Sequence, residues 1–178
     1  MSIIGSVIAR LGSKRLTYKN LLPIQGKPLL GLAIEKLQKV QRIDRVVVST
    51  ESELISRVAK DFGADVLMRP KELAGDEIAS VPVYKHIIEN YPCDLHVNYN
   101  CNFPICPISV IERSIDLAME HGESLSVPFA VWTQTSKCLE NYGDPFQITA
   151  HRFKDDRIHP VDIHTMEDLL CVYREIQG

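Results

Sequence analysis

The segment between residues 10 and 20 concentrates positive charge and contains no acid, whereas acids outnumber bases in the rest of the chain. Lysine and arginine side chains neutralise phosphate oxygens, and backbone N–H groups near a glycine can bind the same oxygens. The segment therefore predicts a loop that binds a polyphosphate, with a solvated basic turn as the alternative. The residues concerned are Arg10, Gly12, Ser13, Lys14, Arg15 and Lys19.

This loop differs from two common phosphate-binding motifs. The motif G-x-x-x-x-G-K-[ST] and the motif G-x-G-x-x-G both need glycines that the segment lacks. A Walker-type site and a Rossmann dinucleotide site are therefore both disfavoured.

Short apolar runs alternate with longer amphipathic segments along the chain, which predicts the elements that position this loop. The expected strands are residues 3–9, 45–49, 65–68, 94–99 and 124–129, with a weaker strand at 146–153 and a brief extended segment at 161–164. The expected helices begin at Pro28 and after Thr50 or Ser52, and then cover residues 80–90, 107–121 and 166–176.

Alternation of strands and helices is typical of an α/β fold with three layers, in which helices cover both faces of a mostly parallel, mixed sheet. Ligands on such sheets bind at the carboxyl ends of the strands. The cationic loop follows the first expected strand directly, so the predicted fold places it where a ligand would bind.

Composition excludes several classes of function. The chain has 178 residues, of which 45% are hydrophobic and 24% charged, as in an ordinary globular domain, so we expect a single domain over residues 1–178. A net charge of −3 lacks the basic excess of a general nucleic-acid binder. No apolar run reaches the length of a membrane span, and the N-terminal segment has its charge after the apolar run, unlike a secretory signal. We therefore expect a cytoplasmic protein that binds neither nucleic acid nor membrane.

The five cysteines predict reduced thiols. Their number is odd and no two are spaced as C-x-x-C, so a disulfide framework and a structural zinc site are both disfavoured.

Several separate motifs, in order along the chain, resemble one family. The first are Ile8-Ala9-Arg10, Gly12-Ser13-Lys14-Arg15, Lys19-Asn20-Leu21 and Gly26-Lys27-Pro28-Leu29. They are followed by Val46 to Thr50, by Arg69-Pro70-Lys71-Glu72-Leu73-Ala74-Gly75-Asp76, and near the end by Val161 to Thr165 with Glu167-Asp168-Leu169. Together they resemble the acylneuraminate cytidylyltransferases, of which this chain would be a short and divergent member.

The resemblance implies a nucleotidyltransferase fold and an enzyme that joins CTP to a sialic-acid-like acidic sugar, with release of pyrophosphate and with Mg²⁺ or Mn²⁺ as cofactor. Arg10, Lys14 and Lys19 would hold the triphosphate as catalytic cations, and Asp162 would ligate the metal. Further nucleotide contacts are implied for Ala9, Gly12, Ser13, Asn20, Arg69, Ala79 and Ser80.

The chain departs from the family pattern at several points. His164 replaces the second metal carboxylate, and a histidine suits Mn²⁺ better than Mg²⁺; it could also be a histidine hydrogen-bonded at a strand end. Cys106 stands where the family has an arginine. Asn100 and Asn102 could bind the sugar, or they could cap a turn.

The sugar-binding segment of the family is shortened in this chain. Basic residues in that region, His151, Arg152, Lys154 and Arg157, could receive a carboxylate or form a solvated face. Trp132 could stack on a ligand, with the core as the safer expectation. A non-catalytic nucleotide-binding homologue, or a transferase with another acceptor, therefore stays open, as does a homodimer.

Overall fold

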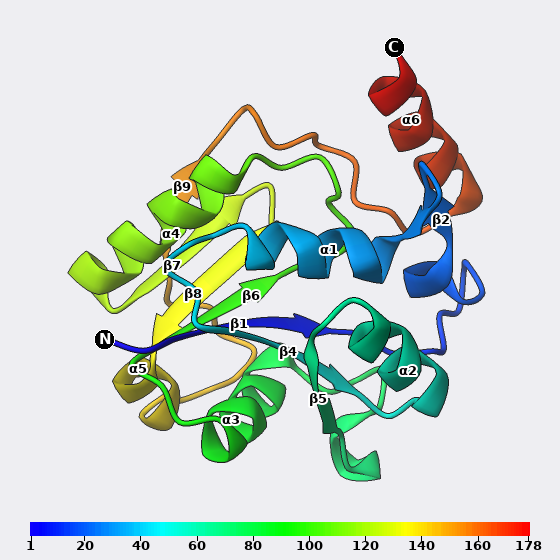
Figure 1. The fold of residues 1–178 in the computed structure, drawn as a ribbon. Helices are drawn as coiled ribbons and strands as arrows, with labels where there is room; N and C mark the ends of the chain where they lie inside the picture. Colours follow the sequence, from blue (N-terminus) through cyan, green and yellow to red (C-terminus); the bar gives the residue numbers. More distant parts are fainter.

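A seven-stranded sheet runs through the computed structural model, which describes residues 1–178 (Figure 1). The strand order is β5-β4-β1-β6-β8-β7-β9. Neighbours pair in parallel, except that β8 is antiparallel to both β6 and β7. This arrangement confirms the predicted mostly parallel, mixed sheet. The strands are β1 (Ile3–Ile8), β4 (Arg45–Thr50), β5 (Asp65–Met68), β6 (Leu95–Tyr99), β7 (Glu123–Val127), β8 (Val131–Thr135) and β9 (His151–Lys154).

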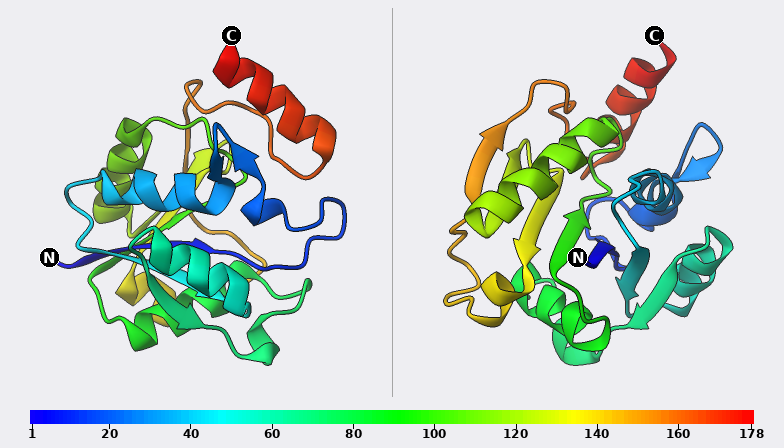
Figure 2. Two further views of the ribbon diagram at one scale, coloured as in Figure 1. Left: turned by 45° about the vertical axis from the view of Figure 1, so that its right-hand side comes forward. Right: turned by 60° about the vertical axis from the view of Figure 1, so that its left-hand side comes forward.

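Helices cover both faces of the sheet and make the three predicted layers (Figure 2). The core on one face includes side chains of α1, α2 and α4, and the core on the other face includes side chains of α3 and α5. No helix is both long enough and apolar enough to span a membrane. The helices are α1 (Leu29–Gln38), α2 (Glu53–Asp61), α3 (Ser80–Asn90), α4 (Ile108–His121), α5 (Ser136–Glu140) and α6 (Met166–Gln177).

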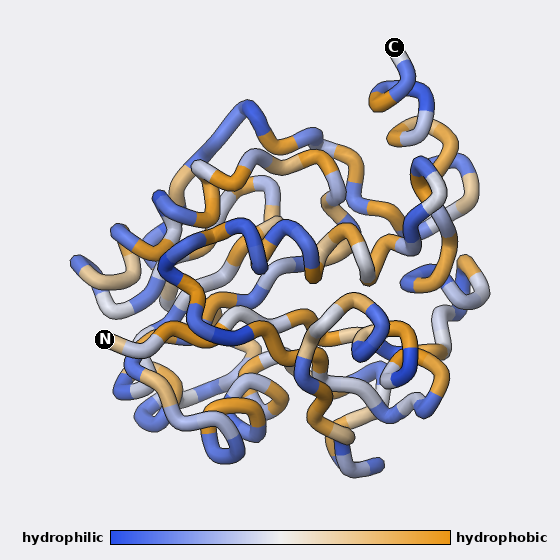
Figure 3. The backbone as a smooth tube through the Cα atoms, viewed as in Figure 1, coloured by the Kyte–Doolittle hydropathy of each residue, from blue (hydrophilic) through white to orange (hydrophobic).

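The central strands are apolar on both sides because both sides are covered. Val46, Val47 and Val48 are consecutive in β4 and all three are buried. Hydrophobic residues accordingly run along the interior of the molecule, while hydrophilic residues gather on its outer turns (Figure 3). Helix α2 begins after Ser52, whose hydroxyl accepts a hydrogen bond from the N–H of Ile55 at 3.3 Å, as an N-cap serine should.

A third apolar cluster lies outside the two sheet cores, where helix α6 projects from the sheet beside a short hairpin (Figures 1 and 2). The hairpin strands are β2 (Pro23–Ile24) and β3 (Lys27–Pro28). The cluster joins the cationic loop, the hairpin, α1 and α6 into one apolar contact. Its buried members are Leu16, Ile24, Leu29, Ile163, Leu169 and Val172.

Two expectations for the second half of the chain were wrong. The strand expected over residues 124–129 ends at Val127, and a further strand, β8, follows it and carries Trp132 into the core, where the side chain is 2% exposed. Ser126 explains the turn, because its hydroxyl accepts hydrogen bonds from the N–H groups of Ala130 and Val131. The strand expected over 146–153 forms only at its end, as β9. Residues 161–164, expected as a brief extended segment, belong to no strand of the sheet.

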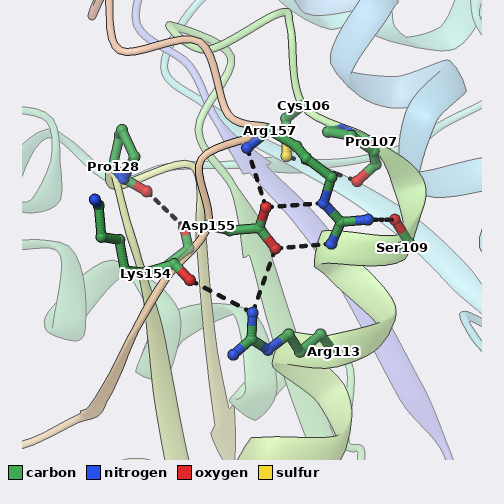
Figure 4. A network of polar contacts seen from close by, with 9 residues as sticks. Cys106, Pro107, Ser109, Arg113, Pro128, Lys154, Asp155 and Arg157 are labelled. Carbon is green, nitrogen blue, oxygen red and sulfur yellow. Dashed lines mark hydrogen bonds and ion pairs between the residues drawn. The ribbon is translucent and has the colours of Figure 1, made fainter.

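Asp155 fixes the path of the chain after β9 (Figure 4). Its carboxylate accepts hydrogen bonds from Arg157 Nε and Nη2, at 2.9 and 2.8 Å, and from Arg113 Nη1 of α4 at 3.4 Å. Hydrogen bonding by Arg157 lowers the pKa of Asp155 to about 2. Asp155 thus belongs to a charged turn, and Arg157 is engaged within the chain.

Candidate active site

A cavity of about 260 Å³ opens at the carboxyl ends of β1 and β6. Its walls come from the loop after β1, the loop after β5, the first turns of α3 and the residues that follow β6. Segments far apart in the sequence therefore meet where the fold predicts a ligand. The sequence-predicted residues in this lining are Arg10, Gly12, Ser13, Lys19, Asn20, Arg69, Ser80, Asn100 and Asn102.

Lys19 is the cation of this lining whose side chain has neither an ion pair nor a hydrogen bond within the chain. It begins a short 3₁₀ helix (Lys19–Leu21), its side chain is half-buried, and its ammonium group forms no ion pair in the structure. Burial lowers the pKa of Lys19, because the charged form loses solvation there. An ammonium group in such a place is stabilised by an anion that enters the cavity.

Arg10 and Lys14 share one carboxylate, that of Asp76. Arg10 hydrogen-bonds one oxygen of Asp76, and Lys14 Nζ lies 2.7 Å from the other oxygen. These contacts lower the pKa of Asp76 to about 2, with the hydrogen bond from Lys14 as the largest cause. Lys14 itself lies in an adjoining hollow rather than in the main cavity. A polyphosphate that binds Arg10 and Lys14 must therefore compete with Asp76, a residue that sequence reasoning did not assign to the site.

Asn20 and Arg69 form hydrogen bonds between the segments that make up the walls of the cavity. Asn20 is buried; its Nδ2 donates to the carbonyl of Arg10 at 3.0 Å, and its Oδ1 accepts from the thiol of Cys101. Arg69 donates to the carbonyl of Ser49 at 2.8 Å and to its hydroxyl at 3.2 Å. Both side chains reach the cavity but also brace the loops that shape it.

Ala9 and Ala79 do not reach the lining. Ala9 is 1% exposed, and its N–H donates to the carbonyl of Ser49, which extends the pairing of β1 with β4. Ala79 is the residue before α3, and the neighbouring Ser80 lines the cavity in its place. The predicted nucleotide contacts of these two alanines stay predictions.

The two asparagines after β6 have different surroundings. Asn100 accepts a hydrogen bond from the N–H of Asn102 and donates to the carbonyl of Phe129, so its amide closes a turn. Asn102 donates from Nδ2 to Asp162 Oδ1 at 2.9 Å. This bond brings the segment after Asp155 to the edge of the cavity.

Asp162 and His164 lie side by side, with 2.9 Å between His164 Nε2 and Asp162 Oδ2. No third histidine, cysteine or carboxylate joins them to form a metal cluster. One carboxylate and one imidazole, both partly exposed, fit a divalent ion such as Mn²⁺ if phosphate oxygens and water complete its coordination. To do so, the pair must give up its mutual contact.

Cys106, at the position of the family arginine, faces away from the cavity. It lines a separate groove beside α1, with Ile176 of α6, and its carbonyl accepts a hydrogen bond from Lys36 Nζ at 2.6 Å. Burial raises the pKa of the Cys106 thiol to about 11. The cavity therefore lacks a cation from this position.

Besides Asp76, sequence reasoning missed two further polar residues of the cavity. Tyr84, on α3, and Asn98, on β6, both line it, and both side chains are buried. Their positions within apolar stretches of an expected helix and strand gave no signal of a site.

Comparisons with known proteins give three findings. The sequence profile of the cytidylyltransferase family matches residues 4–153. An N-acylneuraminate cytidylyltransferase of Escherichia coli O18:K1:H7 is 42% identical over 89 residues, which are 50% of this chain and 21% of the relative. A 3-deoxy-manno-octulosonate cytidylyltransferase of Chlorobium chlorochromatii is 34% identical over 121 residues, 67% of this chain and 45% of the relative.

Among solved structures, the fold is similar to a CMP:2-keto-3-deoxy-manno-octonic acid synthetase complexed with CTP. The TM-score is 0.85 at 16% sequence identity, and the alignment covers 99% of each chain. The chain spans less than half the length of the two curated relatives described above.

Proposed function

This chain belongs to the cytidylyltransferase family, and from that premise we propose that it transfers CMP from CTP to an acidic sugar and releases pyrophosphate. The proposal treats residues 1–178 as one nucleotidyltransferase domain. The observation that carries it is Lys19, a half-buried cation without an anionic partner, in a cavity that Arg10 also lines.

The acceptor is proposed as a keto-deoxy sugar acid of the sialic-acid or the 3-deoxy-manno-octulosonate type. The names of the two relatives support this class and leave both members open. Asn102 offers an amide at the edge of the cavity near Asp162, where its Oδ1 can accept a hydrogen bond from a sugar hydroxyl while its Nδ2 stays bonded to Asp162.

The reaction would be an in-line displacement. An acceptor hydroxyl attacks the α-phosphorus, a new phosphorus–oxygen bond forms, and the bond to the β-phosphate breaks, so that pyrophosphate leaves with the electron pair and the hydroxyl proton passes to solvent. The protein contributes mainly by positioning the groups and stabilising charge. Lys19 and Arg10 would hold the triphosphate, with Lys14 reaching it from the rim and backbone N–H groups at Gly12 and Ser13 binding oxygens.

Asp162 and His164 would hold the divalent metal, with Mn²⁺ favoured over Mg²⁺ by the imidazole. When bound, the ion would neutralise charge on the phosphates. Asn102 would then keep Asp162 oriented through its Oδ1, which leaves Oδ2 to face the ion.

The test is pyrophosphate release with CTP, Mg²⁺ or Mn²⁺, and a panel of sugar acids that includes both acceptor types. We expect turnover with one of the acids and with CTP in preference to UTP, ATP and GTP. Turnover with a different nucleotide, or with a neutral alcohol alone, would replace the proposed substrate pair.

A non-catalytic nucleotide-binding protein is the second candidate. It is favoured by the mutual contact of Asp162 and His164 and by the orientation of Cys106 away from the cavity. Calorimetry separates the two candidates: CTP binding without pyrophosphate release on any acceptor supports the second, and turnover excludes it.

A further inference from the structure

The inner end of the cavity carries two polar groups that the chain leaves without partners. Tyr84 Oη is fully buried and makes no hydrogen bond. Asn98 is 2% exposed, and its only side-chain hydrogen bond is accepted by Oδ1, so its Nδ2 donates to no group of the protein. The side chains of Ser80 and Asn98 lie beside Tyr84 Oη, and their contacts with it oppose the rise of its pKa, but neither contact has the geometry of a hydrogen bond. A buried polar group without a hydrogen-bond partner destabilises the protein, and a ligand that enters the cavity can provide the missing partner.

A chain of hydrogen bonds on the face of the sheet that α3 covers fixes how Asn98 is turned. Ser6 Oγ donates to Asn98 Oδ1 at 3.1 Å and lies 2.8 Å from His96 Nε2. The serine hydroxyl has one proton, which it gives to Asn98, so His96 Nε2 must carry the proton that Ser6 accepts.

The opposite nitrogen, His96 Nδ1, is then an acceptor. It lies 3.2 Å from Gln134 Oε1, which cannot donate, so an acceptor at Nδ1 requires the Gln134 amide to be turned about; Gln134 Nε2 otherwise has no partner. An amide turned so that Nε2 donates to Nδ1 satisfies both groups at once. In this arrangement Asn98 Oδ1 is held from behind, and Asn98 Nδ2 is left for the cavity.

We propose that Tyr84 and Asn98 form a subsite for one neutral sugar hydroxyl, and that Ser6 and His96 act as positioning residues for it. Asn98 Nδ2 donates to the hydroxyl oxygen, and Tyr84 Oη accepts its proton or donates in turn. The hydroxyl belongs either to the ribose of CTP or to the sugar acceptor. This inference rests on the proposed function.

The subsite suits an uncharged group. Burial lowers the pKa of His96 to about 4, so the imidazole beside Tyr84 is neutral near pH 7. Burial raises the pKa of Tyr84, which keeps its hydroxyl protonated. Neither Tyr84 nor Asn98 forms a hydrogen bond with a charged side chain. A phosphate or carboxylate would find its counter-charges at Arg10, Lys19 and Arg69, which come from the segments after β1 and β5 rather than from α3 or β6.

The experiment is the substitution Tyr84→Phe, which removes one hydroxyl and keeps the ring that packs on His96 and Trp132. Calorimetry measures the affinities for CTP, 2′-deoxy-CTP and 3′-deoxy-CTP, and steady-state kinetics measures KM for the acceptor. We expect an unchanged or higher melting temperature, because the lost hydroxyl has no partner. We also expect either a three- to tenfold weaker affinity for CTP or a three- to tenfold higher acceptor KM, in line with the loss of one neutral hydrogen bond of about 1 kcal/mol.

The deoxy nucleotides identify the source. If the subsite binds a ribose hydroxyl, Tyr84→Phe and the native protein should have the same affinity for the deoxy nucleotide that lacks this hydroxyl. If the acceptor is bound, all three nucleotides bind as they do to the native protein and only KM rises. Tyr91→Phe, at the end of the same helix and outside the cavity lining, is the matched control and should change none of these values.

Ser6→Ala tests the positioning role. Loss of the anchor behind Asn98 should reduce the preference for the hydroxylated ligand over its deoxy analogue, a ratio that a general loss of stability would not move. The inference is overturned if Tyr84→Phe leaves every affinity and KM unchanged while the native protein binds CTP. If the native protein binds no CTP, the proposed function fails first and this inference fails with it.

Discussion

Substitution of Lys19 tests most directly whether the cationic loop binds the triphosphate of CTP. Lys19→Ala should weaken CTP binding by about 1.5–3 kcal/mol, because one charge-assisted contact to the triphosphate is lost. Isothermal calorimetry measures this, with Lys60→Ala on the exposed side of α2 as a control that should bind normally. An unchanged affinity would remove Lys19 from the phosphate site.

Asp76 should act in the opposite direction. Its carboxylate neutralises Arg10 and Lys14 in the ligand-free structure, so Asp76→Asn should free both cations and tighten CTP binding several-fold. The same titration reports it. Weaker binding by this variant would mean that Asp76 helps the nucleotide instead of competing with it.

His164 should set the choice of metal. His164→Asp replaces an imidazole by a carboxylate, which suits Mg²⁺ better. We expect the ratio of pyrophosphate release with Mg²⁺ to release with Mn²⁺ to rise in this variant, with Asp162→Asn inactive with either ion. An identical ratio in His164→Asp and the native protein would place the imidazole away from the metal.

For single residues, the sequence predicted which residue types lie near the cavity better than it predicted the hydrogen bonds and ion pairs that they make. Asn20, which belongs to a family motif, and Asn100, where the chain departs from the family pattern, both line the cavity, yet both amides are largely occupied in bracing turns. The contact of Asp76 with Arg10 spans 66 residues, and no local pattern encodes a pairing over such a distance. Tyr84 and Asn98 were missed for the same reason, because only the fold brings a helix and a strand to one cavity.

Among the elements, α1 and α2 depend on a close approach at Gly31. A Cβ added at Gly31 would collide with the ring of Phe62, which follows α2. Gly31→Ala should therefore lower the free energy of unfolding by about 1–3 kcal/mol, the usual cost of overpacking. Urea denaturation measures the loss.

Gly143→Ala provides the matched control, since its Cβ would meet nothing within 4 Å. Adding Phe62→Leu to Gly31→Ala should recover part of the loss. A Gly31→Ala variant as stable as the native protein would show that the Phe62 ring moves aside freely.

The elements of the first half were predictable because β-branched strands and amphipathic helices alternate there with clear ends. The strand β8 was not, because the tight turn around Ser126 joins two strands without a polar interval long enough to mark it. The same difference applies to the cavity. The sequence pattern predicted β1, β5 and α3, which form three of its walls, whereas Phe129 reaches the lining from the turn between β7 and β8, which was not predicted.

For the molecule as a whole, Asp155 predicts a dependence of stability on pH. Its pKa is about 2 in the folded protein against an ordinary value of 3.8, so its contribution is fully present above about pH 4 and is lost as the pH falls toward 2. Asp155→Asn should cost about 2 kcal/mol near pH 7, where hydrogen bonds to a charged group are lost. Denaturation at several pH values should show this difference shrinking between pH 4 and pH 2.

Asp156→Asn is the control for this prediction, because Asp156 is exposed and pairs with Lys154 at the surface. It should change stability little at any pH. A constant difference between Asp155→Asn and the native protein across the acid range would contradict the lowered pKa.

The cytoplasmic location, the single-domain organisation and the homodimer stay predictions.

The apolar cluster beneath α6 has a consequence for how the two sides of the site communicate. Leu16 belongs to the loop that carries the cations, and Ile163 lies between Asp162 and His164 in the sequence. Both side chains are buried in the same apolar cluster, together with Leu169 and Val172. A substitution that opens a cavity in this cluster would therefore weaken nucleotide binding and misplace Asp162 and His164 at the same time, although none of the cluster's side chains contacts either ligand.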